Sequence, residues 1–180
     1  REQPVLPSAC DLWDIANFYE REVYDFYGVI FVNHPDLRRI FLREDWVGFP
    51  FRKDDKPEEK NEEIAVGDEP ISDLAPCYTL NADGSLHCEK TPIFGEDDYV
   101  INLGPQHPST HGVLHFRTRI DGEIITKIDP HLGYIHRAIE KISESLTYPQ
   151  TLALTDRMDY LGAMQNRHAL CACIEQAMGV

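Results

Sequence analysis

The stretch VLHFRTRIDGEIITKID, residues 113–129, decides the fold of the second half of the chain. Apolar and polar residues alternate on both sides of Asp121 and Gly122, a dipeptide typical of a two-residue hairpin turn. The two faces of the first arm are formed by Leu114, Phe116, Thr118 and Ile120 and by His115, Arg117 and Arg119. The pattern predicts an antiparallel β-hairpin.

Before the hairpin lies NLGPQHPSTHGVL, residues 102–114, in which two prolines and two glycines predict a shaped loop. His107 and His111 are four residues apart, a zinc-binding spacing on a helix. Pro108 and Gly112 argue against a helix, so we expect no metal here. His107 either holds the loop through a backbone hydrogen bond or faces a ligand. His111 is the better ligand candidate, because an imidazole can donate to a carbonyl and exchange protons near neutral pH.

Helices are predicted after the hairpin, over residues 135–146 and from residue 158 onward. The second begins at DRMDY, residues 156–160, where Asp156 and Asp159 suit a capping acid and an ion pair. The hydroxyl of Tyr160 can donate to a second carbonyl oxygen. Arg157 and Arg137 stay charged at any relevant pH and either stabilise a nearby anionic centre, such as a reduced iron–sulfur cluster, or form surface ion pairs.

The first segment predicts a helix over residues 11–25, a short strand or buried turn over 29–32 and a second short helix from His34. Glu20, Arg21 and Glu22 form either a charged surface or an interface with buried pairing. The fold class is therefore α+β: a helical and extended N-terminal segment, a linker, then an antiparallel hairpin followed by α-helices.

Three regions are expected: residues 1–55, an acidic and mostly irregular linker over residues 56–98, and residues 99–180. One hairpin is possible in the linker, around residues 81–84. A turn at residues 82–83 would place Cys77 opposite Cys88, whereas a turn at residues 83–84 would place Thr79 opposite Cys88. We expect free thiols.

Charge and length exclude several classes of protein. The 180 residues carry a net charge of -14, which disfavours nucleic-acid binding. No apolar run approaches the roughly 20 residues of a membrane helix, and we expect no signal peptide. Because the chain opens on Arg1 and ends on Val180 inside a helical pattern, we expect a fragment of a larger fold.

Three motifs carry a first resemblance: EREVYDFYG (20–28), HPDLRRI (34–40) and DWVGFPFRK (45–53). Their order and spacing resemble the C-terminal part of the C subunit of the bacterial NADH:quinone oxidoreductase, respiratory complex I. The resemblance identifies residues 1–55 as part of a domain like that of the C subunit.

Four motifs carry a second resemblance, besides residues 102–114: DGE (121–123), PHLGYIHRAIEK (130–141), TYPQ (147–150) and DRMDY (156–160). They resemble the N-terminal part of the D subunit, so that residues 99–180 look like a quinone-site domain and the whole chain resembles the fused C/D form. Ala138 stands where the family usually has glycine. The cysteine motif of the related nickel–iron hydrogenases is absent, which argues against hydrogenase activity.

The resemblance implies a component of a quinone-reducing translocase. His111 and Tyr160 would hydrogen-bond the quinone, and Arg157, with Arg137 as second choice, would approach the terminal iron–sulfur cluster. Partner subunits would bind that cluster and NADH, and this chain would bind no cofactor directly and no metal. The resemblance places it in the peripheral arm, beside the cluster-carrying subunit and the membrane arm, on the cytoplasmic face of the bacterial inner membrane. The alternative is a non-catalytic scaffold fragment, inactive outside the assembled complex.

Overall fold

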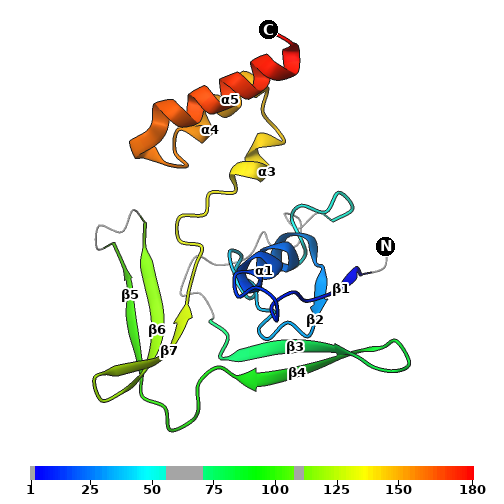
Figure 1. Ribbon diagram of the computed structural model, residues 1–180, viewed down its shortest axis with the longest axis vertical. Helices are drawn as coiled ribbons and strands as arrows, with labels where there is room; N and C mark the ends of the chain where they lie inside the picture. The colour runs from blue at the N-terminus through cyan, green and yellow to red at the C-terminus, as the bar shows by residue number, and fades with distance from the viewer. Residues whose placement is uncertain (1–2, 56–70, 108–111) are drawn as a thin grey trace. The chain divides into compact units, whose positions relative to one another are not determined.

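The computed structural model describes residues 3–55, 71–107 and 112–180. The chain divides into two compact units, Arg1–Ile135 and His136–Val180, and each is described by itself. Helices and antiparallel strands both occur (Figure 1), which confirms the predicted α+β class.

The first unit contains a four-stranded sheet in the order β1-β2-β3-β4. Its strands are β1 (Val5–Pro7), β2 (Ile30–Val32), β3 (Leu74–Leu80) and β4 (Leu86–Pro92). The first three are parallel neighbours, and β3 and β4 form an antiparallel hairpin. Figure 1 shows helix α1 (Ala16–Tyr27) beside β1 and β2. The core is small, with Ile30, Phe31 and Leu37 buried together.

Helix α1 buries its charged face. Glu20, Arg21 and Asp25 are all buried, whereas the apolar positions that predicted the helix are exposed: Leu12, Ile15, Tyr19 and Val23. Gly28 ends the helix in the left-handed conformation. For Glu20 and Arg21, the interpretation as buried pairing is therefore confirmed, and the helix begins five residues later than predicted.

The second short helix predicted from His34 is wrong, because residues 34–42 run as an irregular segment. Asp25, fully buried, explains the difference. One of its carboxylate oxygens accepts the backbone N–H groups of Ile40, Phe41 and Leu42 at 3.2, 2.8 and 2.9 Å. These donors are therefore satisfied without the bonds of a helix.

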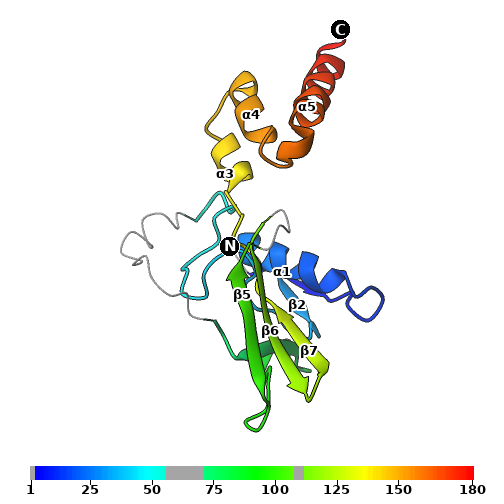
Figure 2. The same ribbon diagram turned by 90° about the vertical axis from the view of Figure 1, so that its left-hand side faces the viewer.

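The predicted hairpin is confirmed and belongs to a three-stranded antiparallel sheet in the first unit. Figure 2 shows β5 (Val100–Gln106), β6 (Leu114–Asp121) and β7 (Ile124–Pro130) side by side. The turn residues are Gly122 and Glu123, one position later than the predicted Asp121–Gly122 turn, because Asp121 pairs with Ile124. Residues 104–106, assigned to the loop from the sequence, instead continue β5, with a register shift between Leu103 and Gln106.

The hairpin expected inside the linker is confirmed as β3–β4, so for residues 74–92 the description as mostly irregular is wrong. The domain boundaries themselves remain a prediction. Both proposed turn registers were also wrong, because Cys77 lies opposite Glu89 and Cys88 opposite Tyr78. Both cysteines are free thiols.

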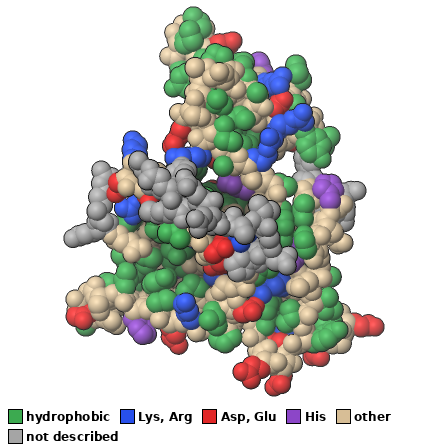
Figure 3. All heavy atoms as spheres, turned by 180° about the vertical axis from the view of Figure 1, so that it is seen from behind, with side chains coloured by type: hydrophobic (Ala, Val, Ile, Leu, Met, Phe, Trp, Pro, Cys, Tyr) green, Lys and Arg blue, Asp and Glu red, His purple; other side chains and the backbone are tan. Residues whose placement is uncertain are grey.

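The second unit is helical, with α3 (Ile139–Ser143), α4 (Tyr148–Thr155), a 3-10 turn η1 (Tyr160–Gly162) and α5 (Ala163–Met178). Helix α3 is shorter than predicted, because Ala138 adopts a left-handed conformation, with φ 50°, directly before it. Figure 3 shows hydrophobic side chains on the surface of these helices. Leu161, Met164 and Met178 are exposed. Among the described residues, no helix has the length and hydropathy to cross a membrane.

Candidate functional site

Five charged side chains join the first 55 residues to the three-stranded sheet, and we call them the interface network. They are Asp36, Arg38, Asp73, Arg117 and Asp129. Asp129, on β7, lies at the centre: Arg38 Nη2 is 2.7 Å from its Oδ1 and Arg117 Nη2 is 2.7 Å from its Oδ2. Each arginine has a second acid, Asp36 at 2.7 Å for Arg38 and Asp73 at 2.5 Å for Arg117.

The centre of the interface network is withdrawn from water, since the side chains of Arg38, Asp129 and Arg117 are 6%, 9% and 10% exposed. Asp73, at its edge, is 78% exposed. Burial acts to raise the pKa of Asp129, but the hydrogen bonds from the two arginines outweigh it and hold the pKa below its ordinary value of 3.8. Asp129 is therefore a carboxylate at neutral pH, shared by two guanidinium groups.

Close backbone packing lies next to the interface network. Gly133 has a φ of +112°, and a Cβ built there would lie 3.3 Å from the carbonyl oxygen of Phe41 and 3.4 Å from that of Ile40. A small cavity of about 40 Å³ is lined on one side by the arginine-rich segment of residues 38–44 and on the other by residues 129–132. The motifs HPDLRRI and PHLGY, which had no assigned role, thus face each other.

Residues 107–113 connect β5 and β6, and we call them the histidine loop. Three ring side chains pack together where β6 begins. His115 is buried on β6, and its Nδ1 lies 2.9 Å from the hydroxyl of Tyr134. The ring centroids of His115 and His131 are 5.2 Å apart. Burial lowers the pKa of His115. A Cβ built on Gly112 would lie 3.4 Å from the side chain of Ile135. The loop is closed at Gln106 and Leu114, which are partners in the β5–β6 ladder.

The structure does not test the spatial relation of the four predicted site residues. His111 lies outside the described residues. Arg137, Arg157 and Tyr160 belong to the second unit and are exposed there, Tyr160 at 54%. His107 is exposed at the end of β5. These residues therefore remain predictions from sequence.

The acids around Tyr160 behave as predicted. Asp159 accepts the backbone N–H of Leu161 at 3.1 Å and caps η1. Asp156 pairs with Arg167 on α5 at 2.5 Å. The hydroxyl of Tyr160 is thus presented from a helix start whose backbone is fixed by a capping acid.

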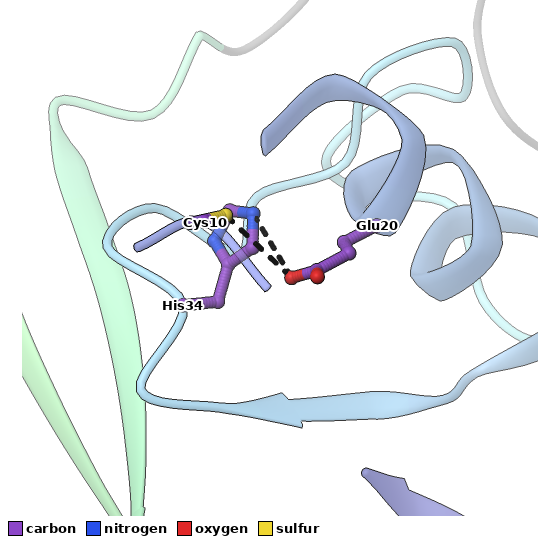
Figure 4. Close-up of side chains that lie close together, drawn as sticks. All are labelled: Cys10, Glu20 and His34. Atoms are coloured by element: carbon purple, nitrogen blue, oxygen red, sulfur yellow. Dashed lines mark hydrogen bonds and ion pairs between the residues drawn. The ribbon is translucent and has the colours of Figure 1, made fainter. Parts of the chain in front are cut away.

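A second group of polar side chains, Cys10, Glu20 and His34, has the residue types of a metal site, and their ligand atoms lie within 4.8 Å of one another. Figure 4 shows the three side chains pointing toward one another, with Glu20 reaching from α1. The hydrogen bonds of His34 decide whether this group can bind a metal. The backbone N–H of Asp36 donates to its Nδ1 at 3.0 Å, so the proton of the neutral ring is on Nε2, which donates to the Asn17 carbonyl at 3.1 Å.

Neither ring nitrogen of His34 therefore has a lone pair for a metal. The Glu20 carboxylate is also occupied, because the Ser8 hydroxyl and the Ala9 N–H each donate to it at 2.7 Å. Burial lowers the pKa of His34 and raises that of Cys10, which keeps both side chains neutral. We assign this group to holding the segment before α1 against the helix.

Sequence reasoning missed the interface network and helix α4. The signal for α4 was present, since Thr147 and Gln150 form a capping box and Pro149 occupies the first turn. For Asp129 no such local signal existed, because its partner Arg38 is 91 residues away.

Comparisons with known proteins match the whole chain. It is 62% identical over 180 residues to the C/D subunit of NADH-quinone oxidoreductase from Phocaeicola vulgatus and 60% identical to that from Bacteroides thetaiotaomicron, covering 100% of this chain and 34% of each relative. A C/D subunit from Aquifex aeolicus is 37% identical over 97% of this chain. Residues 1–61 also match the family described as respiratory-chain NADH dehydrogenase, 30 Kd subunit. The chain spans about a third of the length of these relatives.

Proposed function

We propose that this chain, which belongs with the C/D subunits of NADH-quinone oxidoreductase along its whole length, contributes the quinone headgroup site of such an enzyme. Electrons from the terminal iron–sulfur cluster would reduce the quinone at this site. The observation that carries the proposal is the identity of 60% to a protein of that name over all 180 residues.

The way in which the histidine loop is attached to the sheet supports a binding role. Two paired strands, β5 and β6, close the loop at Gln106 and Leu114. A loop whose ends are fixed by a rigid scaffold is a common way of presenting a ligand-binding side chain. His111 would donate to one quinone carbonyl, and its imidazole can supply a proton near neutral pH.

The second unit would supply the remaining groups. The Tyr160 hydroxyl would donate to the other carbonyl, since it is 54% exposed at a capped helix start. Arg157, exposed two residues after α4, is the better candidate to approach the iron–sulfur cluster, and Arg137 is the second. A permanent positive charge there would stabilise the reduced cluster.

The iron–sulfur cluster itself would be bound by another protein of the complex. Clusters are held mainly by groups of cysteine thiolates. In the part of the chain that the structure describes, Cys10, Glu20 and His34 are the one group of three or more possible metal ligands, and it contains a single cysteine. NADH would likewise bind elsewhere. We place the chain at the cytoplasmic face of the inner membrane, in contact with the cluster-carrying subunit and, within the complex, with the membrane arm.

The alternative, a non-catalytic scaffold when the chain stands alone, is favoured by the exposure of Tyr160 and of the apolar faces of α1 and α5. Apolar faces of this extent usually mark contacts with other protein surfaces. The two functions are compatible, one for the full-length enzyme and one for these 180 residues alone.

The test uses His111→Ala and Tyr160→Phe in the assembled enzyme. Both variants should lose at least tenfold in quinone reduction while NADH oxidation by an artificial acceptor is unchanged, because that electron path ends before the quinone. Tyr148→Phe, another exposed tyrosine of the second unit, is the matched control and should retain quinone turnover. Normal quinone turnover in both site variants would refute the assignment.

A separate measurement tests whether the isolated chain is a non-catalytic scaffold. A quinone titration of the 180-residue chain, followed by NMR, should show no saturable shifts. Saturable binding by the isolated chain would contradict it.

A further inference from the structure

We propose that the first unit carries a binding site for a small organic acid, a carboxylate with a short aliphatic body, in a cleft beside Arg21 that we call the Arg21 cleft. This site is separate from the proposed quinone site and does not depend on it.

The Arg21 cleft has the size of a small-molecule site. Its volume is about 480 Å³, within the range of roughly 300–1,000 Å³ that is usual for ligand pockets. One wall is a face of α1 that carries Asn17, Phe18 and Arg21. The opposite wall is formed by residues 91–93, where β4 ends, and by residues 127–130 of β7. Elements of the fold, rather than loops alone, therefore define its shape.

Arg21 supplies a buried hydrogen-bond donor to this cleft. Its side chain is 6% exposed, and its Nε and Nη2 donate to the carbonyls of Arg38 and Arg39 at 3.2 and 3.1 Å. Among the described residues, the remaining nitrogen, Nη1, makes no hydrogen bond, because its ion pair with Asp36 is 3.9 Å long. Asp36 lines the cleft, whereas Arg39 lines the small cavity described above, so Nη1 is the nitrogen on the cleft side.

Positive charge is left over on the lining of the Arg21 cleft. The two arginines of the interface network are balanced by two of its acids, Asp36 and Asp129. Two other cations line the cleft, Arg21 and Lys127, against one exposed acid, Asp14. The ammonium group of Lys127 donates to a backbone carbonyl rather than to a carboxylate. A ligand with one negative charge would therefore neutralise the cleft and satisfy the donor of Arg21.

The apolar part of the lining specifies the body of the ligand. Phe18, Pro35 and Ile128 line the same cleft, and Ile128 is 49% exposed. An aliphatic chain would cover these side chains while its carboxylate binds the cations. A phosphate monoester suits the cleft less well, because it carries about two negative charges at neutral pH against a surplus of one positive charge.

The test measures binding of octanoate to the full-length protein by isothermal titration calorimetry at pH 7. Octanoate should bind saturably, with a dissociation constant of about 1 mM or less. Octanamide has the same body without the charge and should bind about tenfold more weakly, since hydrogen bonds between charged groups are the stronger ones. Lys127→Gln should weaken octanoate binding by about tenfold for the same reason. Lys90→Gln, at an exposed lysine of β4 outside the cleft, is the matched control and should bind like the parent.

Arg21→Gln is the more direct variant, but it also removes the hydrogen bonds to the carbonyls of Arg38 and Arg39. It is therefore compared only if its circular dichroism spectrum matches that of the parent, and the folded variant should bind octanoate at least as weakly as Lys127→Gln. Lys127 is exposed, so its variant provides the test in either case.

The absence of saturable octanoate binding would overturn the proposal, and so would equal binding of octanoate and octanamide or an unchanged affinity in Lys127→Gln. The same titration of the assembled enzyme distinguishes a free acid from a carboxylate side chain of another subunit. Octanoate binding that persists in the assembled enzyme and depends on Lys127 supports a small-molecule site, whereas its loss on assembly refutes one.

Discussion

Replacing Asp129 by asparagine removes one negative charge from the centre of the interface network and changes no volume. Four hydrogen bonds from Arg38 and Arg117, between 2.7 and 3.5 Å, end on its carboxylate. Removing one partner of a buried ion pair costs about 3–5 kcal/mol. Here each arginine keeps another acid, Arg38 by two bonds of 2.7 Å to Asp36 and Arg117 by its bond to Asp73. We therefore expect Asp129→Asn to lower the free energy of unfolding by the smaller value, about 3 kcal/mol.

Hydrogen exchange measured by mass spectrometry on the full-length protein is a suitable assay, because it reports local opening. A loss of about 3 kcal/mol corresponds to exchange roughly 100-fold faster, since about 1.4 kcal/mol changes an equilibrium constant tenfold. The change should appear in peptides from β6, β7 and residues 34–42 and be absent from α5. Asp121→Asn is the control. Exchange within threefold of the parent protein in the interface peptides would refute the assignment of Asp129 as the centre of the network.

Three further predictions concern Asp129, Gly133 and Ala138. The pKa of Asp129 is depressed in the folded chain, so its contribution to stability is complete above the unfolded value of 3.8 and is lost as pH falls through the lower folded value. Acid unfolding of Asp129→Asn, followed by circular dichroism, should therefore depend less on pH below about pH 4 than that of the parent protein. Parallel unfolding curves for the two proteins would contradict this. Gly133→Ala should loosen the same peptides, whereas Gly84→Ala, also at positive φ but with open space around it, should show only the local strain of its turn; equal effects at the interface would refute the packing role. Ala138→Gly should stabilise the start of α3 by about 1 kcal/mol, because a left-handed alanine is strained, and hydrogen exchange of residues 139–146 should slow, whereas faster exchange would contradict it.

The elements of the chain were predictable where a local pattern specifies them. The Asp121–Gly122 dipeptide and the alternation around it located β6 and β7 to within about a residue. Residues 34–42 were predicted wrongly for a physical reason: Asp25, distant in sequence, takes up three backbone N–H groups that a helix would have used. Helix propensity is a weak preference, and tertiary contacts of this kind override it.

The candidate site was predictable only as a set of residue types. The two motifs PHLGYIHRAIEK and DRMDY were found from sequence, but their spatial relation to His111 depends on long-range packing that a local pattern does not contain. Family resemblance suggested the roles proposed for His111, Tyr160 and Arg157, and physical reasoning supplied the chemistry that suits each. The interface network required coordinates, because charged residues in a sequence look alike whether they are solvated or paired.

Amphipathic periodicity identified α1 and β6 but not the direction in which either faces. In α1 the apolar residues Tyr19 and Val23 are exposed, and Glu20 and Arg21 are buried. In β6 the polar face with His115 and Arg117 is likewise turned inward. The buried side of each element is the one that carries hydrogen-bonding partners, since an acid or arginine can be buried only where another chain segment satisfies it. The contact between the first 55 residues and the three-stranded sheet is therefore specified by paired charges, while the exposed apolar residues of α1 remain open for contacts of a different kind.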